Sequence, residues 1–554
     1  MATPVHLRTL VAVASIPVLL LCLSANSVPA QTAATESTVI RGTVINSKTH
    51  EPVGRALVYS PDNRFATMTD DRGRFQFNLP STNYVRNIGD GYPYALMARK
   101  PGFLPPNNEQ QVLQTGADVT DLTISLVPES LIVGHVQIPS ADGFDTIQVG
   151  LFRRTVREGA EHWDAAGVAR SRSDGEFRFA ELQPGSYKLV THELLDRDPL
   201  NPRGPLFGFP PVYYPSATDF STATIIQLAP GSTFIANISL ARREYYPVRI
   251  KVMNASAELP IGAQIWPQGH PGPGFALGYN SAEQIIQGSL PDGYYVVQVS
   301  SYGPNAMNGS VNLVVKGAPV DGQTVSLLPN VSIPVNVRQE FQHQETLERL
   351  SAMGSSSNAN GWLRSVNVNL VPVEDYGVGG GTSMRHPQNP EDDSPPAIEN
   401  VHPGQYKVLV NSPIGFASSI TSGGADLSKQ PLTVAAGGSA SPIEIILRDD
   451  GAEIDGAIEA VSATTTRQFQ GQVYFIPSGE GGAQFRLTWI MPDGRFQMRQ
   501  LPPGTYRVLA FSRSQDLEYA SAEAMRKYDS KSQVIRVEQG QKEHLRLQLI
   551  TPED

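Results

Sequence analysis

Residues 173–187 read SDGEFRFAELQPGSY, and this stretch decides the fold of the chain. Its Asp-Gly pair predicts a tight turn in which glycine accepts a positive φ. The Phe-x-Phe that follows alternates, so both rings point to one face of a strand, and Pro-Gly then turns the chain into another alternating strand. The stretch therefore predicts a strand–turn–strand unit of an antiparallel sheet.

The same pattern recurs along the chain. A second clear copy, MPDGRFQMRQLPPGTY, occupies residues 491–506, and weaker copies lie at residues 69–80, 285–296 and 398–409. The glycines that open the second strand recur at intervals of 108, 111 and 100 residues, at Gly185, Gly293, Gly404 and Gly504. This period has the size of a β-sandwich domain rather than of a solenoid repeat.

Short alternating strands punctuated by Gly and Pro fill the sequence between the copies, and helical patterns are confined to residues 344–353 and 517–528. We therefore predict an all-β fold, a tandem array of about five Ig-like or transthyretin-like antiparallel β-sandwich domains with short helical insertions. The predicted parts are a signal peptide at 1–30 and sandwiches at 31–130, 131–243, 244–337, 338–450 and 451–554.

The joints between these domains are short. Residues 127–130 and 448–451 lead directly from one predicted strand into the next, which predicts a semi-rigid rod with limited bending. The fourth domain also carries polar, low-complexity segments at 355–361 and 376–396, where we expect mobile loops.

The N-terminus predicts export. Arg8 precedes an apolar run over residues 10–23, and Val28-Pro29-Ala30 offers small residues for cleavage. The run is short for a membrane span, so we expect no integral membrane segment after signal removal and a periplasmic, outer-surface or secreted protein. An alternative is a lipoprotein acylated at Cys22, but Leu21 stands where that signal normally has a small residue.

The composition narrows the classes of molecule that this protein could bind. The 554 residues have a net charge of −10, and their basic side chains are not clustered, which argues against nucleic acid. Cys22 is the single cysteine, so a chain without its signal peptide could form no disulfide.

Residues 41–44 (RGTV), 52–58 (PVGRALV) and 69–75 (TDDRGRF) together resemble the bacterial carboxypeptidase regulatory-like domain. The resemblance covers about 90 residues, from Val39 to about Pro128. It implies a transthyretin-like sandwich of a superfamily that also holds starch-binding-like and collagen-adhesin modules. Such modules usually act as folding, spacing or interaction units, and their motif residues are not catalytic, so the resemblance implies no enzymatic activity.

The sequence lacks the common catalytic patterns. It contains no His-x-x-Glu or His-Glu-x-x-His zinc motif, no Gly-x-Ser-x-Gly elbow and no phosphate-binding Gly-x-x-x-x-Gly-Lys-Ser/Thr loop. We therefore predict neither catalysis nor a cofactor. Lys–Asn isopeptide bonds occur in adhesin relatives of this fold, but no spacing in the sequence identifies the required triad.

Two acidic pairs could be considered as calcium ligands, Asp70-Asp71 and Asp392-Asp393. Asp70 opens an Asp-x-x-Gly turn, in which an aspartate side chain can accept backbone amides. The second pair lies in a proline-rich stretch typical of a solvated loop. The simpler interpretation of both is structural, so we predict no metal site.

The hypothesis that this protein binds a sugar rests on its aromatic residues. Sugar-binding sandwiches expose flat rings on which apolar sugar faces stack. Candidate ligand-binding residues in or near predicted loops are Trp163, Tyr213, Tyr214, Trp266 and Tyr279. The tyrosines that follow the second turn at a constant position, Tyr187, Tyr406 and Tyr506, are instead predicted to be core or corner residues.

The sequence as a whole predicts an exported, non-catalytic modular protein. We expect it to act as a structural or interaction module at the cell envelope, with an unknown envelope protein or polysaccharide as partner. The alternative is a carbohydrate-binding protein that uses the loop aromatics, and in both cases binding falls to the loops between the motif copies.

Overall fold

The computed structural model describes residues 37–60, 66–80, 94–104, 111–113, 119–138, 146–196, 204–255, 259–268, 274–303, 306–346, 348, 361–373, 382–386, 395–459, 471–478 and 484–551. The chain divides into two compact units, Met1–Val127 and Pro128–Asp554. The predicted signal peptide with Cys22, most of the two low-complexity segments and the Asp392-Asp393 pair lie outside the described residues. Within them, no helix is long and apolar enough to cross a membrane.

The first unit contains one sandwich, whose sheets have the strand orders β4-β1-β7 and β3-β2-β5-β6. Its strands are β1 (Ser37–Asn46), β2 (Leu57–Tyr59), β3 (Ala66–Met68), β4 (Arg74–Pro80), β5 (Tyr94–Arg99), β6 (Gln111–Leu113) and β7 (Val119–Leu126). Side chains from both sheets, including Val44, Val58 and Phe75, form one buried core.

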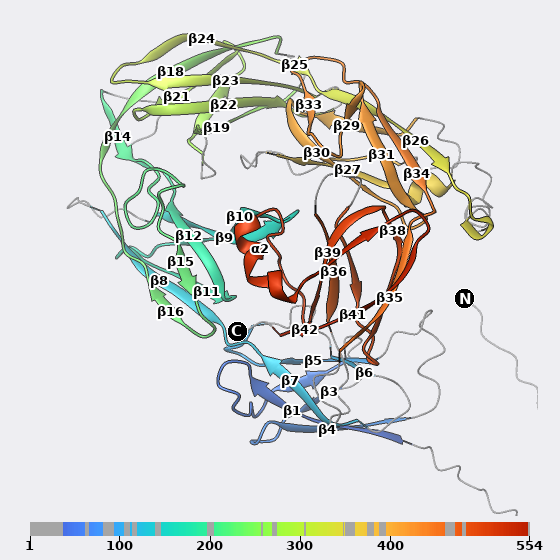
Figure 1. The fold of residues 1–554 in the computed structure, drawn as a ribbon. Coiled ribbons are helices and arrows are strands. Elements are labelled where there is room, and N and C mark those ends of the chain that lie inside the picture. The colour runs from blue at the N-terminus through green and yellow to red at the C-terminus, as the bar shows by residue number, and fades with distance from the viewer. Residues whose placement is uncertain are drawn as a thin grey trace, which may run out of the picture. The chain divides into compact units, whose positions relative to one another are not determined.

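The second unit begins with a sandwich of the sheets β11-β8-β16 and β10-β9-β12-β15 (Figure 1). Its strands are β8 (Ser130–Gln137), β9 (Gln148–Arg157), β10 (Ala160–Arg170), β11 (Glu176–Leu182), β12 (Gly185–Thr191), β13 (Leu194–Leu195), β14 (Leu206–Phe209), β15 (Ile226–Leu228), β16 (Thr233–Ile235) and β17 (Ile238–Ser239). We call it the second sandwich, counting along the chain.

The third sandwich combines the sheets β13-β14-β18-β21-β20, with β24 also paired to β18, and β19-β22-β23-β25. Its own strands are β18 (Arg243–Met253), β19 (Ile261–Pro267), β20 (Leu277–Asn280), β21 (Ile285–Leu290), β22 (Gly293–Ser301), β23 (Met307–Val315), β24 (Val320–Ser326) and β25 (Leu328–Pro329). β13 and β14 come from the second sandwich, so one sheet continues across this joint.

The fourth sandwich has the sheets β29-β26-β34-β31-β32 and β28-β27-β30-β33. Its elements are β26 (Val331–Glu340), η1 (Gly361–Ser365), β27 (Asn367–Pro372), β28 (Thr382–Ser383), β29 (Ala397–Val401), β30 (Gly404–Asn411), β31 (Phe416–Ser422), β32 (Ala425–Asp426), β33 (Leu432–Val434) and β34 (Ile443–Arg448).

The fifth sandwich has the sheets β38-β35-β41 and β37-β36-β39-β40, with β42 beside β39. Its elements are β35 (Ala452–Ile458), β36 (Gln472–Pro477), β37 (Arg486–Trp489), β38 (Arg495–Leu501), β39 (Gly504–Phe511), α2 (Ala522–Met525), η2 (Arg526–Lys531), β40 (Gln533–Val537), β41 (Lys542–Leu547) and β42 (Leu549–Ile550).

All five sandwiches share one plan. In each, the first strand pairs in parallel with a strand near the C-terminal end of the sandwich, as β8 does with β16, and antiparallel with the strand of the motif copy, as β8 does with β11. Each pair of sheets encloses its own buried cluster. The all-β prediction is therefore confirmed. The predicted domain boundaries stay a prediction, because only the division after Val127 separates compact units.

Helix is as scarce as predicted in the described residues, but one predicted helix is too long. Of residues 517–528, only Ala522–Met525 form α-helix, and a 3-10 turn follows. Ser521 caps this helix by accepting the N–H of Ala524 at 3.2 Å. Residues 344–346 and 348 of the other predicted helix are helical, and residues 349–353 lie outside the described part of the chain.

The Asp-Gly turns form as the sequence predicts. Gly175 has a φ of 90°, and the Asp174 side chain accepts the N–H of Glu176 at 3.0 Å. In the first sandwich, Asp70 accepts the amides of Arg72 and Arg74 at 2.9 and 2.8 Å. Both hydrogen bonds lower the pKa of Asp70, and the bond from the Arg74 amide has the largest effect. The carboxylate thus has the turn-forming role that the sequence favours.

Glycine also has a specific place in the first strand of three sandwiches. Gly42, Gly134 and Gly456 lie directly opposite Phe75, Phe177 and Phe496, respectively. A Cβ atom on Gly134 would lie 1.8 Å from the Ala236 carbonyl oxygen and 2.7 Å from the Phe177 ring. The phenylalanine ring occupies the space that glycine leaves, so the Phe of the motif and this glycine form one packing unit.

The tyrosine that follows the second turn closes each corner in the second unit. The hydroxyls of Tyr187, Tyr295, Tyr406 and Tyr506 donate to the carbonyl four residues upstream, at 2.7 to 2.9 Å. The predicted corner role of Tyr187, Tyr406 and Tyr506 is confirmed, since all three are buried. Tyr295 extends the pattern to the third sandwich, where Gly293 is followed by two tyrosines.

Replacing Tyr506 by Phe should destabilise the fifth sandwich by about 1–2 kcal/mol, because a buried carbonyl loses its donor. The Tyr506 hydroxyl donates to the Pro502 carbonyl at 2.7 Å and accepts the Gln484 N–H at 3.3 Å, and burial raises the pKa of Tyr506 to about 12. Urea-dependent pulse proteolysis should show the loss. The exposed Tyr302 offers the matched control, and equal effects of Y506F and Y302F would contradict the corner role.

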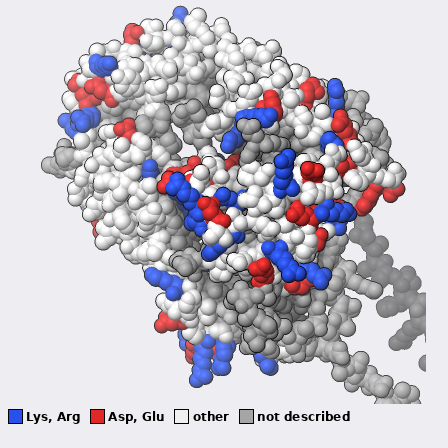
Figure 2. Space-filling model, viewed as in Figure 1, with Lys and Arg blue, Asp and Glu red and all other residues white. Residues whose placement is uncertain are grey.

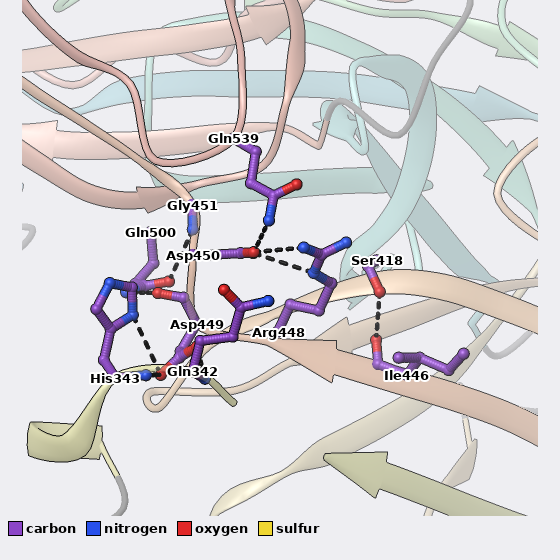
Figure 3. A network of polar contacts seen from close by, with 10 residues as sticks. All are labelled: Gln342, His343, Ser418, Ile446, Arg448, Asp449, Asp450, Gly451, Gln500 and Gln539. Carbon is purple, nitrogen blue, oxygen red and sulfur yellow. Dashed lines mark hydrogen bonds and ion pairs between the residues drawn. The ribbon is translucent and has the colours of Figure 1, made fainter. Parts of the chain in front are cut away.

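A polar network stiffens the joint between the fourth and fifth sandwiches (Figure 3). Asp449 is fully buried and accepts the backbone amides of Gln342 and His343 at 2.8 and 2.9 Å. Asp450 binds the Arg448 guanidinium, and its carbonyl accepts the Gly540 amide at 2.7 Å. The Asp449 carboxylate therefore ties the short joint to the fourth sandwich, and Asp450 ties it to the fifth through its carbonyl and through the Gln539 amide that its carboxylate accepts.

Asp449→Ala should lower stability by about 2–4 kcal/mol, since two amides would lose their buried acceptor, while Asp449→Asn should cost less. Burial opposes ionisation of Asp449, but the Gln342 and His343 amides outweigh it and lower its pKa from 3.8. The stabilisation is therefore present above pH 3.8 and is lost as the pH falls through the lower folded-state pKa. Acid titrations followed by circular dichroism should show a smaller acid-induced loss in D449N; identical titrations would refute the assignment.

Candidate functional site: the contact between the second and fifth sandwiches

The second sandwich carries an extra layer on the outward face of one sheet. The segment between β12 and β15 folds back over β9 and β12, and Tyr213 bridges Val190 of β12. Phe220 lies at the centre of this layer, with edge-to-face contacts to Phe152, Trp163 and Tyr213 at 5.6 to 5.7 Å between ring centroids. These contacts form a second, smaller core outside the sandwich.

Lys188 is enclosed by the same layer. Its Nζ donates to the Phe220 carbonyl at 2.7 Å and lies 4.1 Å from the Phe220 ring centroid and 4.9 Å from that of Trp163. Burial lowers the pKa of Lys188, and the nearby Glu161 carboxylate opposes that shift. The aromatic rings and one carbonyl thus stabilise a buried cation.

The structure separates the five aromatic residues proposed for sugar binding. Trp163 and Tyr213 meet in the outer layer around Phe220, whereas Tyr214 packs against Phe234 at 5.9 Å on the side of the main core. Trp266 and Tyr279 belong to the third sandwich, where Tyr279 packs partly buried against the core. No single surface collects all five.

Their predicted location in loops is wrong for three of them. Trp163 lies in β10, Trp266 in β19 and Tyr279 in β20. Tyr213 and Trp266 are also buried, at 3% and 7% exposure, so their rings are not open to a sugar. For Tyr213 the physical reason is that the segment between β12 and β15 packs against β12 around Phe220, which the sequence around Tyr213 does not reveal.

The fifth sandwich has a matching outer layer. The segment between β39 and β40 contains α2 and covers the outward face of β36 and β39. Leu517 and Met525 from this segment are buried against Tyr474 and Phe511. In both sandwiches the covering segment follows the strand that begins with Pro-Gly, so the two layers arise at equivalent points of the repeat.

The two outer layers meet in a contact that we call the clasp. It consists of Arg154, Glu158 and Gly159 at the β9–β10 hairpin and of Glu518, Tyr519 and Ala520 in the fifth sandwich. Arg154 Nη2 donates to Glu518 Oε1 at 2.6 Å, the Ala520 amide donates to the Gly159 carbonyl at 2.9 Å, and the Tyr519 hydroxyl donates to Glu158 Oε2 at 3.4 Å.

The clasp has close steric complementarity. Gly159 has a φ of 73°, and a Cβ atom placed on it would lie 2.4 Å from Cδ2 of Tyr519. The other face of the Tyr519 ring stacks on Phe485, with centroids 4.7 Å apart and planes 10° apart. The tyrosine ring is therefore held between a glycine turn of one sandwich and an aromatic ring of the other.

Glu161 connects the clasp to the aromatic layer. Its Oε2 lies 3.1 Å from Arg154 Nε, and its Oε1 accepts the Trp163 indole N–H at 2.7 Å. Burial is the main cause that raises the pKa of Tyr519, and the nearby Glu158 carboxylate raises it further. Tyr519 therefore stays a neutral hydrogen-bond donor at physiological pH. Charge pairing and aromatic packing thus act together at one contact.

The visible surface near this contact is mixed in charge. Figure 2 shows Lys and Arg side chains interspersed with Asp and Glu over the fifth sandwich, while larger areas of the same face are uncharged. In the part of the chain that the structure describes, no group of three or more His, Cys, Asp and Glu is placed to hold a metal ion. The clasp residues themselves form hydrogen bonds, an ion pair and a ring contact that join the two sandwiches.

The sequence did not identify the clasp or Trp489. Nothing in the local sequence pairs residues 516–519 with the Glu-Gly turn at 158–159. Trp489 on β37 is 66% exposed, and Leu487 on the same face is 43% exposed. The alternation of Leu487 and Trp489 predicts a common face, but not that this face is open.

Comparisons with known proteins leave the family open. No protein-family model matches the chain, and no curated protein matches it. Among solved structures, the TIE protein of Bacillus anthracis matches with 13% identity and a TM-score of 0.16, over 52% of this chain and 50% of its own, so this chain spans about half of that structure.

Two pilins also match. GBS52, the minor pilin of Streptococcus agalactiae, has 14% identity and a TM-score of 0.19 over 37% of this chain and 95% of its own. The shaft pilin SpaA of Lactobacillus rhamnosus GG has 10% identity and a TM-score of 0.18 over 37% of this chain and 98% of its own. Scores this low do not establish a common fold, so the fold of this chain rests on its own sheets and cores.

Proposed function

We propose that this chain is an exported, non-catalytic modular protein that presents or spaces a binding surface at the cell envelope. The clasp carries this proposal, because it joins two sandwiches whose contacting residues lie 364 positions apart in the sequence. A contact of this kind restricts how the joined sandwiches move relative to one another, which lowers the entropy that a large partner would lose on binding.

The use of the polar residues supports a non-catalytic role. Asp70 and Asp174 hold turns, Tyr506 holds a corner, and Asp449 holds a joint. Each of these groups has a structural hydrogen bond to the backbone, and a catalytic group would instead need a free face toward a substrate.

The test compares binding by the intact chain and by a clasp variant. Purified residues 31–554 and the Glu518→Arg variant should be cross-linked to isolated envelope fractions, with the exposed Glu523→Arg variant as control. We expect saturable capture by wild type and by E523R, and weaker capture by E518R. Turnover of a substrate in a broad hydrolase panel, or the absence of saturable capture, would refute the proposal.

A second candidate function is carbohydrate binding, and the exposed Trp489 favours it. A flat indole on a sheet face can stack on a sugar ring, and its neighbour Leu487 extends the apolar surface. Of the residues first proposed for this role, Trp163 keeps a partly exposed ring, although its N–H is bound to Glu161. A glycan array should distinguish them: loss of binding in W489A alone supports the sheet face, loss in W163A supports the outer layer, and no binding by wild type rejects the function.

A further inference from the structure

A carboxylic acid is enclosed in the joint between the second and third sandwiches. Glu193 lies between β12 and β13, and its Oε2 accepts the Ala276 amide of the third sandwich at 3.3 Å. The residue is half-buried as a whole, but its Oε1 is closed off from solvent and has no hydrogen-bond partner. A buried carboxylate with so few donors is costly, and protonation relieves that cost.

The joint around Glu193 is a continuous sheet. β13, which begins at the next residue, pairs with β14, and β14 pairs with β18 of the third sandwich through Leu206 and Tyr245. Leu206 is buried in the core of the third sandwich. The two short strands therefore connect the position of Glu193 directly to the packing of the next sandwich.

Burial disfavours the anion of Glu193 more strongly than the Ala276 amide and the nearby Tyr245 hydroxyl favour it. The titratable groups that interact with it are Tyr245 and Tyr295 of the third sandwich. Around these two tyrosines lie Asp196, which acts on Tyr245, and Asp292, which acts on Tyr295. Arg242 Nε donates to Asp196 Oδ2 at 3.0 Å, so this cation is engaged by the Asp196 carboxylate. Asp196 raises the pKa of Tyr245 and Asp292 raises that of Tyr295, so both add negative charge beside the two phenols that interact with Glu193.

Tyr245 completes the enclosed group. It is 2% exposed, and its hydroxyl has no hydrogen bond of standard geometry. Burial and then the neighbouring Glu193 carboxyl raise the pKa of Tyr245, while burial raises the pKa of Glu193 from 4.5 to about 7. Below neutral pH the joint thus encloses a neutral acid beside a neutral phenol, and above it the joint must enclose an anion.

We propose that this joint is a pH-responsive latch, closed while Glu193 is a neutral acid and loosened when its carboxylate forms. The direction follows from proton linkage. Because the acid binds its proton more tightly in the closed joint than in the open one, closure is most favourable at acidic pH and weakens as the pH rises from about 4.5 to about 7. The proposal concerns the joint alone and stands independently of the proposed function.

Hydrogen–deuterium exchange of Leu194–Leu195 and Leu206–Phe209 tests the latch in the full chain. After correction for the intrinsic pH dependence of exchange, wild-type protection of these strands should fall at least about tenfold between pH 5 and pH 8.5. Glu193→Gln, which keeps a neutral side chain of the same shape, should abolish this dependence. Equal pH dependence in wild type and E193Q would overturn the latch.

Two further measurements keep the test decisive. Glu283→Gln removes an exposed carboxylate of the third sandwich, which pairs with Arg249, and should leave the wild-type pH dependence unchanged. If E193Q does not fold, the wild-type titration alone decides: a loss of protection completed near pH 7 supports the latch. A loss completed near pH 4.5, or no loss, refutes it.

Discussion

Gly134→Ala should prevent the second sandwich from folding in its present form. The added Cβ would lie 1.8 Å from the Ala236 carbonyl oxygen, which belongs to the segment paired in parallel with β8, and 2.7 Å from Phe177. Neither neighbour can withdraw without separating the strands or emptying the core. We expect a loss of more than about 4 kcal/mol, in the range of severe core disruption.

Hydrogen exchange can localise this effect to one sandwich. In G134A, β8 and β11 should lose protection while β35 and β38 of the fifth sandwich keep theirs. Gly438→Ala is the control, because a Cβ there has contacts no closer than 3.6 Å. Wild-type protection of β8 in G134A would show that the parallel neighbour can shift, and the proposed glycine–phenylalanine unit would then be wrong.

Gly159→Ala should open the clasp without unfolding either sandwich. The Cβ would lie 2.4 Å from the Tyr519 ring, which cannot retreat because Phe485 stacks on its other face. Loss of the contact frees the Ala520 amide, whose acceptor is the Gly159 carbonyl. Exchange of the Ala520 amide should therefore rise at least about tenfold, while β9 and β10 stay protected.

Gly317→Ala is the matched control for the clasp. Gly317 has a φ of 60°, close to the 73° of Gly159, but a Cβ there would have no neighbour within 4 Å. Both variants carry the cost of about 1 kcal/mol for alanine at positive φ, so a difference between them reports the contact alone. If G317A frees the Ala520 amide as much as G159A does, backbone strain and not the clasp is responsible.

The repeated motif predicted the strands and turns of the sandwiches well because each of these features depends on residues that are close together in the sequence. Asp-Gly requires a turn, alternating apolar residues require a half-buried strand, and Tyr187 finds its acceptor only four residues upstream. The motif is weaker in the third and fourth sandwiches, and the residues that face each other between the first strand and the motif strand explain why. There, Val248 lies opposite Gly288, and Ile333 lies opposite Ile398, so neither has the glycine–phenylalanine unit.

The candidate site could be predicted only in part. Trp163 and Tyr213 were identified as aromatic residues outside the repeat, and they do meet, but as packing around Phe220 rather than as an open platform. Exposure depends on whether a segment from elsewhere covers a ring. The sequence near Trp163 does not show this, because the ring that packs on Trp163 is that of Phe220, in the segment between β14 and β15.

The sequence by itself determined the all-β class, the turns, the corner tyrosines and the spacing of the copies, because each depends on residues within one strand–turn–strand unit. The tertiary structure alone decided which outer faces are covered, which carboxyl group is enclosed at a joint, and that Arg154 meets Glu518. Those contacts join different sandwiches through residues that are far apart in the sequence, and no local periodicity encodes the position of one such surface relative to another.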